Sequence, residues 1–532
     1  MQLANLTDYP YPSMRRVMMG KRGAVATSQP LATLAGMEML LAGGNAVDAA
    51  VAMAIALTVV EPTSNGIGAD AFALVWDGKL HGLNASGKSP QSLNLEAFSG
   101  MDKVPETGWL PVTVPGAVSA WRTLWQRWGK LPFEQLFAPA IRYAQSGFPV
   151  SPVTAQAWKR AERVFLPLTG NEFEPFKQVF FPGNKAPAAG EVWGSKLHGK
   201  TLRAIASSGG DSFYKGELAE KIANFAAETG GFLTVSDLES HQADWVDPIS
   251  TNYRGLTVWE LPPNTQGIAT LIALNILEGF DIGKYPRESV ESYHVQIEAM
   301  KLAFADIHRY VADTRFMDVS VASLLDKTYA KKRRSLIGDR AIPIADPGIP
   351  KGGTVYLAAA DGELMVSFIQ SNYEGFGSGI LVPETGIALH DRGACFTLES
   401  GHPNQVGAAK RPFHTIIPGF LSQDNRPLGP FGVMGGPMQP QGHLQVVVNI
   451  KDYGMNPQAA LDAPRWQFIA GNLAILEPEV SEEIAQKLAD RGHEISISTN
   501  PWLFGKGQII FKQGEVFVAG SEPRGDGMAL AW

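Results

Sequence analysis

KGGTVYLAAAD, residues Lys351–Asp361, is followed by Gly362 and by a second apolar run, Leu364–Gln370. The residues from Thr354 to Ala360 alternate as an antiparallel strand does, and the Asp-Gly pair at the end of the run is typical of a two-residue type I′ turn. We therefore predict a β-hairpin whose first strand begins at Thr354.

Two glycines, Gly352 and Gly353, stand immediately before this threonine. The peptide bond at the head of a strand can be strained, and the hydroxyl of Thr354 can attack the carbonyl that precedes it, in which case the chain cuts itself. The new terminal residue would carry a nucleophilic hydroxyl and an α-amine of pKa about 7.7–8 that can act as its base. A threonine in a strand is more often only a β-branched residue that packs well.

Length and composition exclude several classes of protein. The chain has 532 residues, 45% of them hydrophobic and 18% charged, so it is too long for one small core. The formal charge of -7 and a longest basic run of Lys331–Arg334 argue against nucleic-acid binding. The apolar run Ala49–Val60 is shorter than the roughly 20 residues that cross a bilayer, and Met1–Arg16 lacks a secretory core. We expect a cytoplasmic protein without a membrane partner.

The sequence gives only weak evidence for other kinds of site. Cys395 is the single cysteine, so no intrachain disulfide is predicted, and a small buried residue is the simpler role for it. The histidines show no HExxH and no close Cys/His spacing, so we predict neither a metal nor a cofactor. Gly194–Thr201 matches the P-loop string, but the Pro- and Gly-rich residues 182–191 before it cannot be a central strand. Nucleotide binding remains the rival enzyme class.

The periodicity predicts an α+β fold. Helices are expected at Leu31–Ala42, Ala46–Val60, Gly116–Leu168, Leu218–Glu228, Thr265–Gly279 and Ser289–Asp313, and strands at Ala71–Trp76, His81–Asn84 and Thr257–Pro262. We expect Leu166–Gly194 to be a surface connection, and the chain after Phe376 to form hairpins and short strands, Val446–Val448 among them. Prolines and glycines over Gly338–Gly353 predict an irregular, accessible linker that ends at Thr354.

Several motifs together resemble the γ-glutamyltransferase family, in the family's order and over nearly the whole chain. They are Gly43–Ala50, Trp245–Arg254, Gly353–Thr354, Gly377–Gly379, Lys410–Pro412, Gly435–Gly436 and Asp462–Arg465. The resemblance implies an amino-terminal-nucleophile hydrolase with an αββα sandwich, made as one precursor. It also implies that the precursor is cut into a large chain, 1–353, and a small chain, 354–532. The two chains are expected to stay together as a heterodimer in one αββα unit, and a higher homo-oligomer is also possible.

The resemblance assigns roles to single residues. Thr354 takes the place of the nucleophile, and Gly435 and Gly436 take the place of the oxyanion hole. Adjacent glycine amides can approach an oxyanion without a side-chain clash, and one such donor is typically worth roughly 10²- to 10³-fold in rate; a plain glycine turn is the alternative. Gln370 and Asn372 cover the family's polar residues beside the nucleophile, so Asn372 is the expected oxyanion or amide donor and Gln370 is expected to contact substrate.

The departures from the family point to the substrate. Ser86 stands where the family places an arginine for the substrate's α-carboxylate, and Arg392 and Cys395 stand where it contacts the α-amino group. His414 and Thr415 replace the family's serine pair. A pocket with Arg392, His414 and Thr415 suits a small anionic amide, because guanidinium matches carboxylate bidentately, unless Arg392 is in a structural ion pair.

This pattern resembles the oxamate amidohydrolase branch of the family, which implies hydrolysis of oxamate to oxalate and ammonia. The alternatives are a γ-glutamyl hydrolase or transferase that acts on glutathione-like compounds, an acylase of the cephalosporin type, and an inactive binding protein on the same fold.

We predict that the purified protein gives two bands on a denaturing gel, 1–353 and 354–532, because Thr354 cuts the bond before it. Thr354→Ala lacks the hydroxyl and should stay uncut, whereas Thr354→Ser should retain some cleavage. Active wild-type protein that runs as one full-length band would contradict self-cleavage. Protein that is both uncut and inactive would favour the binding-protein alternative.

Overall fold

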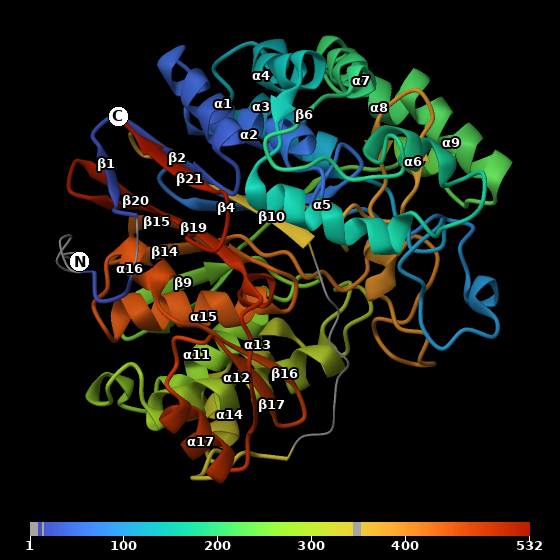
Figure 1. Cartoon of the computed structure of the whole chain (residues 1–532). Helices are drawn as coiled ribbons and strands as arrows, with labels where there is room; N and C mark the ends of the chain where they lie inside the picture. The colour runs from blue at the N-terminus through green and yellow to red at the C-terminus, as the bar shows by residue number, and fades with distance from the viewer. Residues whose placement is uncertain (1–8, 13–14, 344–352) are drawn as a thin grey trace.

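The computed structural model describes residues 9–12, 15–343 and 353–532, and its core consists of two seven-stranded sheets (Figure 1). All strand pairs within these two sheets are antiparallel. Sheet I contains, in spatial order, β21 (Met528–Ala531), β2 (Gly23–Thr27), β10 (Gly353–Asp361), β11 (Leu364–Tyr373), β3 (Asp70–Trp76), β4 (Leu80–Asn84) and β7 (Asp244–Val246).

Sheet II packs face to face against sheet I. Its strands, in spatial order, are β1 (Met18–Gly20), β20 (Val516–Ser521), β19 (Lys506–Gln513), β15 (Arg426–Met434), β14 (Gly419–Gln423), β9 (Leu256–Glu260) and β8 (Ile249–Tyr253). Shorter strands form three small sheets: β5 (Phe148–Pro149) with β6 (Val192–Trp193), β12 (Leu381–Val382) with β13 (Ile387–Ala388), and β16 (Trp466–Ala470) with β17 (Leu473–Leu476) and β18 (Glu494–Ile497).

Helices cover the outer face of each sheet (Figure 1). On the side of sheet I lie α1 (Pro30–Leu41), α2 (Ala46–Val60), α3 (Ala117–Trp128), α4 (Phe133–Ser146), α5 (Pro152–Phe165), α6 (Glu174–Phe180), α7 (Lys196–Ser207), α8 (Asp211–Lys215), α9 (Glu217–Thr229) and α10 (Val235–Glu239). On the side of sheet II lie α11 (Gly267–Leu277), α12 (Val290–Tyr310), α13 (Val321–Leu324), α14 (Lys327–Arg334), α15 (Met438–Lys451), α16 (Pro457–Asp462) and α17 (Glu482–Asp490). The α+β class is as predicted.

The most buried helix is α2, and its bounds match the prediction from sequence. Every residue of α2 is buried, and Asn45 and Asp48 form a capping box at its start. Among the described residues, no helix is long and apolar enough to span a membrane. Ser195 caps α7, so the P-loop-like string forms a helix from Lys196 onward and does not form a phosphate-wrapping loop.

The predicted hairpin is β10 and β11, but its turn differs from the expectation. Asp361 pairs with Leu364, so the turn residues are Gly362 and Glu363. Of these two, only Gly362 has a positive φ, 54°, which does not fit the predicted type I′ turn, because that turn needs a positive φ at both central residues. Most of the predicted linker, 344–352, lies outside the described residues.

Two further predictions from sequence were wrong. Val446–Val448 belongs to α15, because burial of that helix against sheet II outweighs the β propensity of three valines. The segment Leu166–Gly194 is not merely a surface connection. It contains α6, and Phe176 and Phe180 pack in the core against Phe376.

The two sheets touch closely where Tyr356 of β10 faces Gly432 of β15. A Cβ atom on Gly432 would lie 2.5 Å from the Tyr356 ring, which is buried and held by a 2.8 Å hydrogen bond to Ser367. We predict that Gly432→Ala lowers the free energy of unfolding by about 1–3 kcal/mol, because an overpacked core must shift.

The measurement is guanidinium unfolding in a Thr354→Ala background, so that every sample is one chain. Gly407→Ala is the matched control, because nothing lies within 4 Å of its added Cβ, and it should change stability by less than about 0.5 kcal/mol. Equal stability of the two variants would show that the sheets can separate at this contact without cost.

Candidate active site

Thr354 lies at the start of β10, and its side chain points between the two sheets. It is 1% exposed, and strand alternation puts it on the same face as Tyr356, which packs in the inter-sheet core. Its hydroxyl oxygen lies 3.2 Å from Ser371 Oγ, and Gln439 Nε2 donates to it at 3.5 Å. The predicted nucleophile is therefore a buried hydroxyl with two polar neighbours.

A bulge in β11 produces this arrangement. Gly353 pairs with Tyr373 and Val355 pairs with Gln370, so Thr354 faces two residues, Ser371 and Asn372. β-Bulges re-aim side chains and occur often next to active sites. Here the bulge turns Ser371 toward the threonine and ends regular pairing at Tyr373, whose φ is 79°.

Gly435 and Gly436 form the turn from β15 into α15. Their φ values are 135° and 58°, which favour glycine at both positions. Gln439 links this turn to the threonine, because its backbone N–H donates to Gly436 O at 3.1 Å and its side chain reaches Thr354. The N–H of Ile417 donates to Gln439 Oε1 at 2.9 Å and so fixes the amide orientation. The amino-terminal end of α15, with its partial positive charge, thus begins beside the nucleophile.

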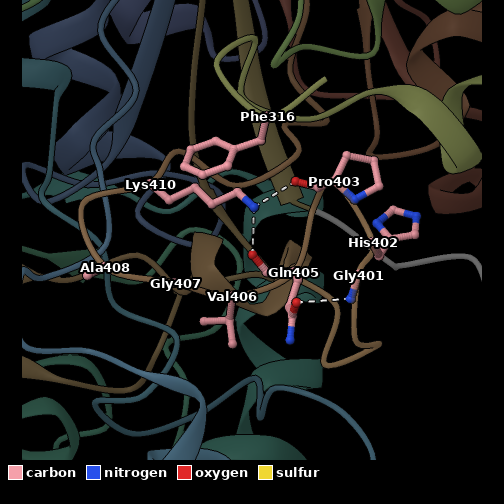
Figure 2. A pocket seen from close by; sticks show the side chains of 9 residues that line it. All are labelled: Phe316, Gly401, His402, Pro403, Gln405, Val406, Gly407, Ala408 and Lys410. Carbon is pink, nitrogen blue, oxygen red and sulfur yellow. Dashed lines mark hydrogen bonds between the residues drawn. The ribbon is translucent and has the colours of Figure 1, made fainter. Parts of the chain in front are cut away.

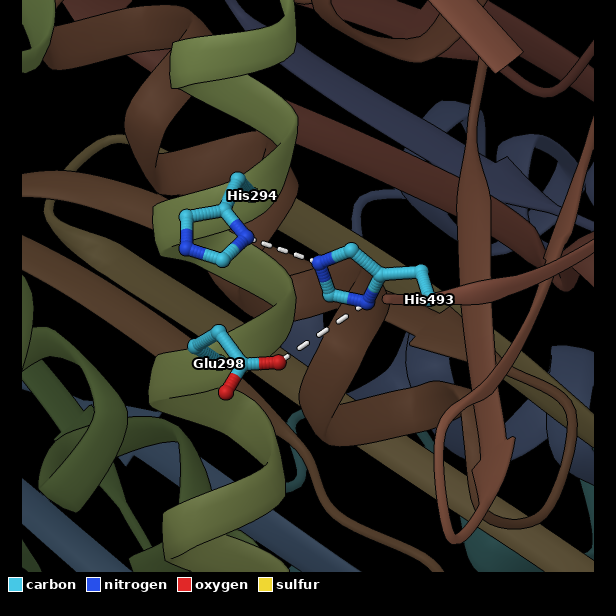
Figure 3. A group of neighbouring side chains, drawn as sticks. All are labelled: His294, Glu298 and His493. Carbon is cyan, nitrogen blue, oxygen red and sulfur yellow. Dashed lines mark hydrogen bonds and ion pairs between the residues drawn. The ribbon is translucent and has the colours of Figure 1, made fainter. Parts of the chain in front are cut away.

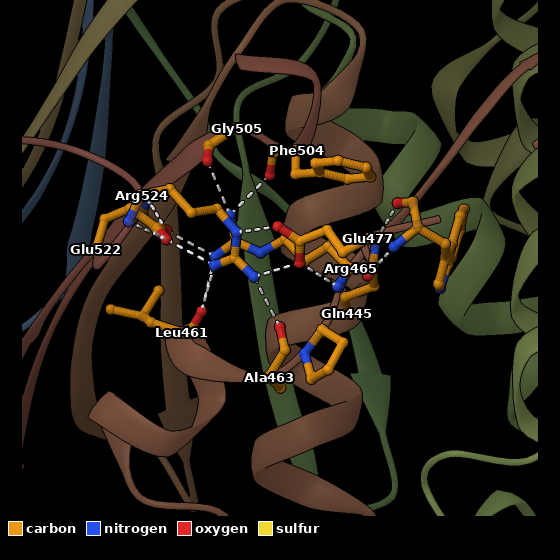
Figure 4. A network of polar contacts seen from close by, with 12 residues as sticks. Gln445, Leu461, Ala463, Arg465, Glu477, Phe504, Gly505, Glu522 and Arg524 are labelled. Atoms are coloured by element: carbon orange, nitrogen blue, oxygen red, sulfur yellow. Dashed lines mark hydrogen bonds and ion pairs between the residues drawn. The ribbon is translucent and has the colours of Figure 1, made fainter. Parts of the chain in front are cut away.

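A buried charge network around Arg465 and Arg524, shown in Figure 4, includes Gly505, which packs against the glycine turn. Arg465, from the family-like run Asp462–Arg465, donates to the carbonyls of Phe504 and Gly505 at 2.7 and 3.0 Å. Gly505 in turn lies against Gly435, where an added Cβ would be 3.1 Å from Gly505 Cα. Glu522 accepts from Arg465 at 2.8 Å, so this buried guanidinium is paired. The network therefore fixes the position of Gly505, against which the glycine turn packs.

Arg392 is a fully buried cation close to the nucleophile. It lies in a short 3₁₀ turn (Arg392–Cys395), its guanidinium stacks 4.3 Å above the Tyr373 ring, and Nη1 donates to Thr415 Oγ1 at 2.7 Å. Among the described residues, its Nε and Nη2 find no hydrogen-bond partner and no carboxylate forms an ion pair with it. The Tyr373 N–H donates to Ser371 Oγ, which connects this cation to Thr354.

Gln266 closes these contacts into a ring. Its Nε2 donates to the carbonyls of Thr415 and Gly436, the second at 2.9 Å. The ring runs from Thr354 through Ser371, Tyr373, Arg392, Thr415, Gln266, Gly436 and Gln439 back to Thr354. Sequence reasoning missed Ser371, Gln266 and Gln439. No motif marks them, and only the fold brings them to the threonine.

His414 lies in the same region but is held by a carboxylate. Its Nε2 is 3.0 Å from Asp70 Oδ2, and both side chains are fully buried. Burial raises the pKa of Asp70 to about 7 and, with the nearby Arg392 charge, holds the pKa of His414 well below its usual value. The pair therefore keeps the imidazole in one orientation next to Thr415.

Two predicted residues are not brought to Thr354 as expected. Gln370 lies on the opposite face of β11, where it accepts from Trp121 at 2.9 Å and donates to Asn65 at 2.6 Å. Asn372 lies beside the nucleophile strand but donates to Phe376 O at 3.1 Å, while its Oδ1 has no partner among the described residues. Their roles at the site stay predictions.

Ser86 and Cys395 lie at the edge of the site. The Ser86 hydroxyl donates to Asn84, and the Ser86 carbonyl accepts from Arg411. Because serine is uncharged, its side chain cannot replace the arginine that the family uses for the substrate's α-carboxylate. Burial raises the pKa of Cys395, whose sulfur lies 3.7 Å from Arg392 Nη1. A raised pKa disfavours the thiolate, and therefore disfavours this cysteine as a nucleophile.

A pocket of about 390 Å³ opens beside the Lys410–Pro412 turn (Figure 2). Lys410 Nζ donates to the carbonyls of Pro403 and Gln405 and lies 4.2 Å above the Phe316 ring. The ammonium group therefore holds the 401–410 loop in shape. None of the ring residues lines this pocket, so it is separate from the contacts around Thr354.

Comparison with known proteins adds to this geometry. Residues 32–532 match the family model described as gamma-glutamyltranspeptidase. The chain is 35% identical to the glutathione hydrolase-like YwrD proenzyme of Bacillus subtilis, over 97% of this chain and 100% of that protein. It is 31% identical to the oxamate amidohydrolase proenzyme of Klebsiella pneumoniae, over 96% and 98% of the two chains. The crystal structure of cephalosporin acylase from Bacillus halodurans superposes with a TM-score of 0.95 at 53% identity, covering 99% of each chain.

We predict that Gln439→Met slows any reaction that needs the Thr354 hydroxyl by roughly five- to tenfold, because the hydrogen bond to that hydroxyl, worth about 1 kcal/mol, is lost together with the bond from the Ile417 N–H. Self-cleavage and amide hydrolysis are both measured. Gln445→Met is the matched control on the same helix: it removes a bond to Trp466 and does not contact Thr354. Equal rate losses in the two variants would contradict a role for Gln439 at the nucleophile.

Proposed function

The chain belongs to the gamma-glutamyltranspeptidase family, and we propose that it is a self-processing amide hydrolase whose nucleophile is Thr354. The observation that carries this proposal is the threonine's place at the head of β10, with its hydroxyl between Ser371 and Gln439 and beside the start of α15. The layer order of helices, two sheets and helices fits the αββα sandwich of amino-terminal-nucleophile hydrolases. Several relatives are named proenzymes, which supports a precursor that is cut.

The proposed reaction uses Thr354 twice. In the precursor its hydroxyl attacks the carbonyl of Gly353 and the peptide C–N bond breaks, so that the hydroxyl proton ends on the leaving nitrogen and the α-amine is freed as the ester forms. Water then hydrolyses this ester, which releases the Gly353 carboxylate and regenerates the hydroxyl. In the mature enzyme the hydroxyl attacks the substrate's amide carbonyl, its proton passes to the α-amine, and the amine returns a proton to the leaving nitrogen. Backbone N–H groups of the Gly435–Gly436 turn stabilise the oxyanion. Water then hydrolyses the acyl ester and releases the acid.

Arg392 sets the proposed substrate class. A buried guanidinium with two free donor nitrogens is costly without a partner, and a carboxylate supplies both charge and matching geometry. We therefore place a carboxylate of the acyl group on Arg392, with Thr415 fixing the cation. The smallest such substrate is oxamate, which would give oxalate and ammonia.

A γ-glutamyl group fits less well, because its α-ammonium needs an anionic partner. Asp391 is the carboxyl next to Arg392, and burial with the nearby Glu374 raises its pKa well above its usual value. A carboxyl group whose charged form is disfavoured offsets an ammonium charge poorly. Its Oδ1 accepts from the Glu374 N–H at 3.0 Å, and its Oδ2 has no hydrogen-bond partner among the described residues.

A second candidate is an acylase that removes an acidic acyl group from a larger amine. It is favoured by one observation, the 53% identity to the cephalosporin acylase of Bacillus halodurans over almost the whole chain. Both candidates share the nucleophile and differ in the size of the leaving amine.

We predict that ammonia release from oxamate exceeds release from oxamate methyl ester, which lacks the charge, by roughly ten- to a hundredfold in kcat/KM. Loss of a charge-assisted bond costs about 1.5–3 kcal/mol. Arg392→Ala should erase this preference, whereas Arg392→Lys, which keeps the charge but not the planar fork, should retain part of it.

The same assay includes a γ-glutamyl anilide and a glutaryl amide of a bulky amine. Faster turnover of the glutaryl amide would favour the acylase. Faster turnover of the γ-glutamyl compound, or a preference for the acid that survives in Arg392→Ala, would contradict the assignment of Arg392.

A further inference from the structure

Three side chains on one face of α12 hold the segment Gly338–Ile342, which lies just before residues 344–352. The ring of His294 bonds Gly338 O at 2.8 Å through Nε2. Glu298 accepts from the Ile342 N–H at 2.8 Å, and Lys301 donates to Ile342 O at 2.7 Å. These residues are at most 1% exposed, and their spacing of four and three residues puts them on a single helix face.

The second half of this cluster comes from the chain beyond Thr354. His493 lies 2.7 Å from His294, nitrogen to nitrogen, and Asn472 Oδ1 accepts from Lys301 at 2.8 Å (Figure 3 shows the two rings and Glu298). The backbone adds a further bond, because the Ala341 N–H donates to Arg491 O at 2.8 Å. We call His294, Glu298, Lys301, Asn472 and His493 the α12 clamp.

The hydrogen bonds fix the protonation of the clamp. His294 Nε2 faces a carbonyl, so it carries the proton, and its Nδ1 accepts from His493 Nε2. Burial lowers the pKa of His294 and lowers that of His493 to about 3, so both rings are neutral. Lys301 and Glu298 form an ion pair of 2.9 Å whose remaining donors and acceptors are used on Ile342 and Asn472. The clamp is therefore a buried network in which, among the described residues, His493 Nδ1 has no hydrogen-bond partner and lies 3.8 Å from Glu298 Oε1.

The clamp also contains a geometric candidate for a metal site. Ligand atoms of His294, Glu298 and His493 lie within 4.8 Å of one another. However, the Lys301 ammonium sits 2.9 Å from the Glu298 oxygen, and the bond between the two rings already uses a nitrogen of each. A cation would have to overcome repulsion from Lys301 and break the bond between the rings. The contacts fit a role in holding the chain better than a role in metal binding.

We propose that the α12 clamp positions the precursor for self-cleavage, an inference that rests on the proposed self-processing at Thr354. Roughly ten residues separate Ile342 from Gly353, so the clamp fixes the chain against small-chain residues a short distance before the scissile bond. Because the clamp combines residues from both sides of the junction, it also keeps the end of the large chain bound to the small chain after the cut.

The test is a time course of self-cleavage of the full chain made by cell-free synthesis. The double variant Glu298→Gln/Lys301→Met removes both charges of the ion pair. It also removes the hydrogen bond that Lys301 donates to Ile342 O. Removing both partners avoids leaving one buried charge. We expect self-cleavage to slow by about tenfold or more, while kcat of the matured enzyme stays within about twofold of wild type, because no clamp residue contacts the ring around Thr354.

The matched control is Asp306→Asn/Arg333→Met. This ion pair of 3.0 Å also joins α12 to a neighbouring segment, but neither residue touches Gly338–Ile342. Its self-cleavage rate should equal that of wild type. If the clamp variant does not fold, Asn472→Ala, which removes one acceptor of Lys301 from a half-buried position, should still slow cleavage by about fivefold.

The outcomes separate the two proposals. Wild-type chain that is never cut would overturn the proposed function itself. Wild-type chain that is cut, with clamp variants cut at the same rate, would overturn the clamp alone. Equal slowing in the clamp and control variants would also overturn it, because the effect would then follow general loss of stability and not the hold on Ile342.

Discussion

The pairing of β10 with β11 is the constraint on which the rest of the site depends. Side chains alternate between the two faces of a strand, so a slip of one residue would send Thr354 to the helix side of sheet I. Regular pairing from Val355 to Asp361 fixes the register, and the bulge at Ser371–Asn372 adjusts only the last step before Gly353. The inter-sheet packing of Tyr356 on Gly432 then holds the strand at a set distance from sheet II, which carries the glycine turn.

Burial explains why the site is a closed ring of polar contacts. In a low-dielectric interior an unmatched polar group is costly, so each ring member is held by a neighbour. The groups that lack partners among the described residues are therefore informative. Near the ring, two nitrogens of Arg392 and one oxygen each of Asn372 and Asp391 meet this description; Asn372 is in β11, and Asp391 and Arg392 lie at the start of the 3₁₀ turn. Support from Asp70 under His414 and from Arg465 under the glycine turn keeps this arrangement rigid.

Much of this structure follows from local sequence signals. The hairpin is marked by alternation and a glycine turn, and α2 is marked by its cap and its continuous apolar run, so both were predictable. The glycine pair was recognised through family resemblance, and the structure places it at the turn from β15 into α15. The bulge at Ser371–Asn372 has no sequence mark, so the sequence did not show that Ser371 is the residue of β11 that meets the Thr354 hydroxyl.

Contacts between residues that are far apart in the sequence were also not predictable. Gln266 reaches Gly436 across 170 positions, and His294 reaches His493 across 199, so no spacing rule connects them. Helix α15 was hidden because its three valines favour a strand in isolation, and only packing against sheet II makes a helix the better solution.

The central claim is that one residue, Thr354, is both the cleavage point and the catalytic nucleophile. The most direct test is mass spectrometry of the small chain after rapid acid quench from a slowly hydrolysed acidic amide. The account predicts a chain that begins at Thr354 and gains the mass of the acyl group, with the added mass on the peptide that carries this threonine. A small chain that begins elsewhere, or an acyl group on any other residue, would contradict it.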